Sequence, residues 1–132
     1  MTLLAMDVFN DSKMALAVSS GFSASSFNEV KAALDVPKKV LAEAVHIPER
    51  TFDRRQQKHQ PLSVDESERL LRFARLFVRA VQVLGNPEQA KLWMQRPNTA
   101  LGGKTPFRFA QTEPGAREVE KVLGRTEHGV FS

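Results

Sequence analysis

The fold is decided by residues 38–58, which read KKVLAEAVHIPERTFDRRQQK. Lys38 to Val45 has the apolar spacing of a short helix, and Glu49 to Lys58 continues as a polar helix whose one apolar residue is Phe52. The small Ala42 lets the two helices approach where they cross, and Phe52 anchors the second helix from inside. The stretch therefore has the spacing of a helix-turn-helix whose second helix projects from the surface.

The turn between these helices, Val45-His46-Ile47, is followed by Pro48, which suits a helix start because its missing N–H is not needed there. His46 stands at a turn position where glycine is frequent. We therefore expect the turn to form without easy access to positive φ, the backbone region that glycine enters at little cost.

The outer face of the second helix carries groups that read DNA bases. At about 100° per residue, Arg50, Arg54 and Gln57 lie opposite Phe52, whereas Arg55 lies nearer the core and reaches out along the rim. Arginine pairs with guanine and glutamine with adenine in the major groove, and lysines suit phosphates. The candidate DNA-contacting residues are Lys38, Lys39, Arg50, Thr51, Arg54, Arg55, Gln57 and Lys58. The alternative is a pair of antiparallel surface helices with a solvated charged face.

The charge distribution favours the first interpretation. The net charge is +4, but residues 1–36 carry two lysines against four acidic residues, whereas residues 37–61 carry six lysines and arginines against three acidic residues. A local excess of cations suits an anionic partner, most commonly nucleic acid.

The longest predicted helix follows, from Val64 to Leu84. Ser63 with Glu66 three residues later forms a capping box, and Gly85 suits the C-terminal cap. The faces of this helix are too apolar for packing on one side only, so both halves of the chain, or a second subunit, are expected to pack against it. Strand signals are almost absent, with no tyrosine and no sustained alternation, and the predicted fold class is all-α.

Several classes of protein are excluded by what the sequence lacks. It has no cysteine, no secretory leader pattern and no apolar run that could span a membrane, which favours a cytoplasmic, nucleoid-associated protein without a membrane partner. Gly103-Lys104-Thr105 resembles a phosphate-binding loop, but Asn98 stands where that loop needs glycine. The three histidines lack metal-ligand spacing. We therefore expect no enzyme activity, no metal and no cofactor.

The second half of the chain is expected to hold shorter helices. Asn86-Pro87, Thr105-Pro106 and Thr112-Glu113 look like helix starts. A glycine- and proline-bearing loop covers 96–105, the last helix is expected to end at Gly124, and residues 125–132 are expected to form a tail.

Distinctive motifs occur in this half, namely Trp93, Arg96-Pro97-Asn98, Ala100-Leu101-Gly102-Gly103-Lys104-Thr105-Pro106, Thr112 with Gly115, Val122-Leu123-Gly124-Arg125 and His128-Gly129-Val130-Phe131. Together they resemble the toxin-binding domain of the Xre/MbcA/ParS antitoxin family. The part upstream, including Leu62-Ser63, Arg69-Leu70 and Leu84-Gly85, resembles the segment that joins this domain to an Xre-type helix-turn-helix. The resemblance covers roughly residues 27–132.

The resemblance implies a function as an antitoxin. Such a protein binds a RES-domain toxin that destroys NAD, blocks the toxin's active site, and represses the shared promoter by binding double-stranded operator DNA. It also implies a homodimer, whose paired recognition helices read two half-sites, and a higher-order complex with the toxin. The toxin-contacting residues that it implies are Trp93, Leu101, Gly102, Gly103, Arg125, Glu127, His128, Phe131 and Ser132.

Plainer interpretations stay open for these residues: Trp93 as a core residue, 101–103 as a simple inter-helix loop, and 125–132 as a frayed tail. The expected domains are an N-terminal segment at 1–26, compatible with flexibility, a DNA-binding and dimerisation region at 27–85, and a toxin-binding domain at 86–132. The alternative function is a stand-alone dimeric helix-turn-helix repressor or partitioning protein without a toxin partner.

Overall fold

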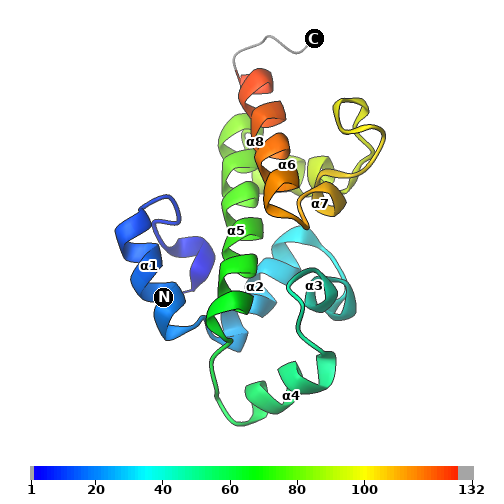
Figure 1. Cartoon of the computed structure of the whole chain (residues 1–132). Helices are drawn as coiled ribbons and strands as arrows, with labels where there is room; N and C mark the ends of the chain where they lie inside the picture. The colour runs from blue at the N-terminus through cyan, green and yellow to red at the C-terminus, as the bar shows by residue number, and fades with distance from the viewer. Residues whose placement is uncertain (1, 128–132) are drawn as a thin grey trace. The chain divides into compact units, whose positions relative to one another are not determined.

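The computed structural model describes residues 2–127, and this part of the chain folds into helices with no strand (Figure 1). The elements, with η for a 3-10 helix, are η1 (Leu3–Ala5), α1 (Asp11–Ser20), α2 (Ala24–Leu34), α3 (Lys38–Ala44), α4 (Glu49–Gln57), α5 (Val64–Leu84), α6 (Pro87–Gln95), η2 (Thr99–Leu101), α7 (Pro106–Phe109) and α8 (Glu113–Glu127). The all-α prediction is confirmed. No helix of this part is long and apolar enough to cross a lipid bilayer.

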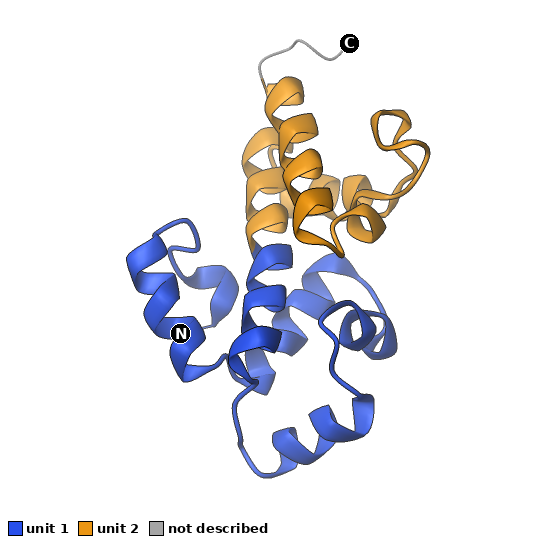
Figure 2. Cartoon of the chain, viewed as in Figure 1, with its two compact units in different colours: residues 1–74 blue, residues 75–132 orange. Residues whose placement is uncertain are grey.

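The chain divides into two compact units, residues 1–74 and 75–132, which Figure 2 shows in blue and orange. The division falls inside α5, so this helix contributes its first half to one unit and its second half to the other. Contacts join α2 to η1, α3 and α4 in the first unit, and α7 to α6 and α8 in the second.

Two aromatic rings lie at the centre of the first unit. Phe27 of α2 and Phe52 of α4 are fully buried, and their ring centroids lie 4.2 Å apart with the planes tilted by 38°. Such a pair adds about 0.5–1.5 kcal/mol to the stabilisation from burial of the rings alone. The prediction that Phe52 anchors its helix from inside is confirmed, and Phe27 is its partner.

The helices α2, α3 and α4 end in the same way. In each, a residue other than glycine takes positive φ at the helix end: Asp35, the C-cap of α2, at 54°, and His46 and His59, which follow the C-caps of α3 and α4, at 60° and 55°. At the end of α3, the Ile47 N–H donates to the Ala42 carbonyl oxygen over 2.9 Å and the His46 N–H donates to the Glu43 carbonyl oxygen over 3.2 Å. These two bonds define a Schellman motif, which needs a left-handed residue at its centre. The expectation that the His46 turn avoids positive φ is therefore wrong.

Residues 2–20 form η1 and α1, in a segment for which the sequence predicted no helix and only compatibility with flexibility. Glu29 of α2 holds the chain start: its carboxylate accepts from the Thr2 hydroxyl over 2.6 Å and from the Leu4 N–H over 2.7 Å. The Asn10 side chain caps α1 by accepting from the Lys13 N–H over 3.0 Å. The buried side chains of this segment are Leu3, Val8, Met14 and Val18.

The long helix α5 occupies its predicted range, and its capping box is confirmed. The Glu66 N–H donates to Ser63 Oγ over 3.2 Å, and the Ser63 N–H donates to a Glu66 carboxylate oxygen over 2.8 Å. At the other end Gly85 takes φ of 100°. The apolar side chains that α5 buries are Leu70, Leu71, Phe73, Ala74, Leu76, Phe77 and Ala80.

The three helix starts predicted for the second unit are confirmed. The side chains of Asn86, Thr105 and Thr112 accept from backbone N–H groups of the first turns of α6, α7 and α8. Gly115 permits a close approach at the third start, because a Cβ there would lie 1.8 Å from the Phe109 carbonyl oxygen.

The last helix runs beyond its predicted end. Gly124 lies inside α8, which continues to Glu127, so the prediction of a tail is wrong for residues 125–127. A contact between α8 and α5 explains the extension. The Arg79 guanidinium binds both Glu127 carboxylate oxygens, over 2.6 and 3.0 Å, and this bidentate pair stabilises the last turn.

Candidate functional site

The helix pair α3–α4 presents a polar face over a buried interior. Ala42, where the two helices cross, is 1% exposed, and Phe52 lies beneath α4. On α4 the structure places Arg50, Arg54 and Gln57 on the exposed side. Lys58 and Lys39 are also exposed, while Thr51, Arg55 and Lys38 are half-buried. Five of the eight candidate DNA-contacting side chains are therefore exposed.

Lys38 bridges the two helices of the hairpin. Its Nζ lies 2.9 Å from Asp53 Oδ1 and 4.0 Å from a Glu49 carboxylate oxygen. The hydrogen bond to Asp53 raises the pKa of Lys38 above its ordinary value, although burial opposes the shift. The charge of Lys38 is thus compensated by carboxylates of α4. The sequence had predicted a phosphate contact for Lys38 and gave no sign of this pairing.

Arg55 points to the protein interior and pairs with Glu66. Its guanidinium donates to a Glu66 carboxylate oxygen, the same one that accepts from the Ser63 N–H. The side chains of Arg55 and Glu66 are 22% and 10% exposed, so solvent screens this pair only partly. The capping box predicted from sequence therefore has a third member, contributed by α4.

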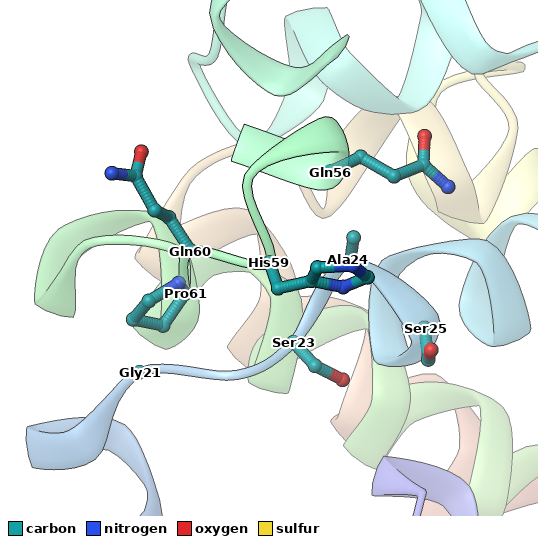
Figure 3. Close-up of a pocket in the computed structure, with 8 residues that line it drawn as sticks. All are labelled: Gly21, Ser23, Ala24, Ser25, Gln56, His59, Gln60 and Pro61. Carbon is teal, nitrogen blue, oxygen red and sulfur yellow. The ribbon is translucent and has the colours of Figure 1, made fainter. Parts of the chain in front are cut away.

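A cavity of about 330 Å³ lies where α4 ends beside the start of α2. Figure 3 shows the His59 ring extending toward the N-terminal end of α2. The lining residues are Gly21, Ser23, Ala24, Ser25, Gln56, His59, Gln60 and Pro61. Hydroxyl, amide and imidazole groups from two distant segments meet here, which no local sequence signal could indicate. Within residues 2–127, no cluster of three or more His, Cys, Asp or Glu could hold a metal ion.

The second unit places its candidate residues in three settings. Trp93 is half-buried on α6, next to Leu92, which is 40% exposed. Leu101 is buried, whereas Gly102 and Gly103 are exposed with φ of 68° and 84°. These glycines close a compact turn in which the Gly103 N–H donates to the Asn98 carbonyl oxygen over 2.9 Å.

The remaining candidates of this unit lie at the end of the chain. Arg125 and Glu127 are exposed residues of α8, and Glu127 pairs with Arg79. His128, Phe131 and Ser132 lie outside the described residues. The six of these nine candidates that the structure describes thus lie on three segments: α6, the η2 turn and the end of α8.

A second cavity, of about 490 Å³, lies between the loop before α7 and the start of α8. Lys104, Arg108 and Glu118 contribute charged groups to it, with Phe109 between them. Sequence analysis missed these residues as a group. The close contact of Gly115 with the Phe109 backbone fixes α7 against α8 and so brings these charged residues together.

Comparisons with known proteins match both units. The family described as "Antitoxin Xre-like helix-turn-helix domain" matches residues 13–75, and the "Antitoxin Xre/MbcA/ParS C-terminal toxin-binding domain" matches residues 79–129. The first match begins inside α1.

Curated relatives agree with these matches. A protein named Antitoxin Xre from Yersinia enterocolitica is 36% identical over 117 residues, which cover 88% of this chain and 79% of the relative. An Antitoxin Xre from Pseudomonas putida is 39% identical over 83 residues, covering 63% of this chain and 52% of the relative. A protein named "Prs ADP-ribosylating antitoxin" from Sphingobium is 29% identical over 124 residues, covering 87% of this chain and 78% of the relative.

These relatives are antitoxins, and the toxin-binding domain favours that class over a stand-alone repressor. The helix-turn-helix indicates DNA as one partner and the C-terminal domain indicates a toxin as the other. The chain belongs to the Xre antitoxin family, with an Xre-like helix-turn-helix domain followed by a toxin-binding domain of the Xre/MbcA/ParS type.

Proposed function

We propose that this antitoxin neutralises a RES-domain toxin that degrades NAD, and that it represses the promoter of its own operon. The observation that carries the proposal is the presence, in one chain, of an Xre-like helix-turn-helix and a C-terminal toxin-binding domain. The RES partner rests on the resemblance of the loop and tail motifs to those of antitoxins that pair with such toxins.

In this proposal residues 86–132 of the antitoxin bind the toxin. The half-buried Trp93, the exposed Gly102-Gly103 turn and the end of α8 are surfaces that a partner can reach. We infer that the segment from Arg125 to Ser132 enters the toxin's active site and obstructs NAD. An aromatic residue such as Phe131 would then act as an anchor, because aromatic side chains dominate the energetics of many interfaces.

In the same proposal residues 27–85 bind DNA and mediate dimerisation. The exposed side of α4 carries arginine and glutamine, which fit the major groove. In a homodimer two such helices would read half-sites separated by about 34–36 Å, one turn of DNA. Acting on an operator, the protein would work in the cytoplasm at the nucleoid, where a higher-order complex with the toxin would also form.

Co-expression of the chain with a RES-domain toxin tests the toxin assignment. Expression of the toxin alone should stop growth and lower cellular NAD, and co-expression should restore both. A chain that restores neither growth nor NAD contradicts the assignment. A promoter–reporter fusion tests repression separately: reporter output should fall when the antitoxin is supplied, with an unrelated promoter as the control.

A further inference from the structure

We propose that Arg55 is a positioning residue of the DNA-reading helix: it acts through Glu66 and does not itself contact the duplex. The inference rests on the proposed DNA-binding role of α4. It differs from the sequence-based expectation that Arg55 reaches DNA along the rim of the helix.

The first step is the fixed position of Glu66. Its carboxylate accepts from the Ser63 N–H over 2.8 Å, and its own N–H donates to Ser63 Oγ over 3.2 Å, so the capping box holds it from two sides. The neighbouring Ser67 is fully buried, and its hydroxyl accepts from the Phe22 N–H over 3.0 Å. The first turn of α5 is thereby bonded to the core of the first unit.

The second step is the way in which α4 is held. Phe52, against Phe27, anchors the helix at one point of its inner face. One aromatic contact fixes where the helix lies but leaves rotation about that contact poorly constrained. Arg55, three residues along the same inner side, adds a second point by pairing with Glu66.

The third step is the comparison with the ion pairs that Lys38 makes with α4. Lys38 pairs with Asp53, but these side chains are 37% and 51% exposed, so water and salt screen their attraction. Arg55 and Glu66 are 22% and 10% exposed. Their pair is thus less screened, and it is the one suited to fix the rotation of α4.

Salt dependence separates a positioning residue from a contacting one. Each phosphate contact contributes about −0.9 to the slope of log affinity against log salt concentration. Arg55→Gln should therefore weaken DNA binding and leave this slope unchanged. Lys58→Gln, at an exposed position of the same helix end, is the matched control, and it should reduce the magnitude of the slope by about one if Lys58 binds phosphate.

A double-mutant cycle tests the coupling through Glu66. Glu66→Gln keeps an oxygen for the Ser63 N–H but removes the charge that Arg55 needs. We expect about a tenfold loss of DNA affinity for Arg55→Gln, a similar loss for Glu66→Gln, and no further loss in the double variant. Glu68→Gln, an exposed position on the same helix, controls for the change in net charge. Circular dichroism of each variant checks that it is folded at the temperature used.

The measurement is fluorescence anisotropy of the full chain with two labelled duplexes of equal length, one from the chain's own promoter and one unrelated. If the wild-type chain shows no preference for the promoter duplex, autorepression fails, while the Arg55 comparison still holds on either duplex. If Arg55→Gln reduces the magnitude of the salt slope, Arg55 contacts DNA. If Glu66→Gln binds like the wild type, Arg55 does not act through Glu66. Either result overturns the positioning role.

Discussion

His46 has a backbone conformation that its side chain disfavours. Its φ of 60° closes the Schellman motif between α3 and α4, and a residue with a Cβ pays about 1–2 kcal/mol for the left-handed region. Glycine removes that penalty but loses more entropy on folding, so His46→Gly should raise the free energy of unfolding by up to about 1 kcal/mol. Urea denaturation measures the change. His46→Ala, which retains the Cβ, is the control and should give no gain; a loss of stability in the glycine variant would contradict the argument.

Arg54 is the residue whose loss should weaken promoter binding most directly. It is exposed on α4, opposite the buried Phe52. Arg54→Ala should reduce affinity for the promoter duplex by about 1–3 kcal/mol if it makes a bidentate contact to a base. Arg117→Ala, at an exposed position of α8, removes the same charge from the second unit and should leave DNA affinity close to that of the wild type. Equal affinities for Arg54→Ala and the wild type in a gel-shift titration would show that Arg54 does not contact a base.

At the level of helices, α8 depends on α5 for its last turn. Glu127→Gln removes the charge that binds Arg79 in a bidentate pair. The last turn of α8 should then open more often, so amides near residues 124–127 should exchange faster with deuterium. Because Arg79 and Glu127 are 25% and 37% exposed, the free energy of unfolding should change by no more than about 1 kcal/mol. Glu118→Gln breaks an exposed pair with Lys121 on the same helix and should leave those amides unchanged.

Helix boundaries set by local signals were predictable from sequence. Ser63 with Glu66, Asn86 before Pro87, and Thr105 before Pro106 each place a capping oxygen within three residues of its donor, and all three starts are confirmed. The end of α8 was not predictable, because the partner of Glu127 lies 48 residues away on α5. The helix α1 was missed for a related reason. Its ten residues bury only Met14 and Val18, too few to give a clear apolar stripe.

For the whole molecule, the helix α4 and its exposed face could be predicted and its support could not. The exposed position of Arg54 follows from its spacing relative to Phe52 within one helix. The supports join residues from different elements: Phe27 with Phe52, and Arg55 with Glu66. Only the folded chain brings such pairs together. The same holds for the cavity between Ser23 and His59, whose two sides come from α2 and from the end of α4.

A chain with two partners should lose its two functions separately. Deleting residues 128–132 removes the last five residues of the expected toxin plug, residues 125–132, but leaves α8 and its Arg79–Glu127 pair in place. The truncated chain should keep its helical content and its affinity for the promoter duplex, yet cells that co-express it with the toxin should stop growing and lose NAD. Arg54→Ala should do the reverse, since it lies in the other compact unit, and should protect cells while failing to repress the promoter. Normal growth of cells with the truncated chain would show that the toxin is blocked by other residues, such as those around Trp93 and Gly102.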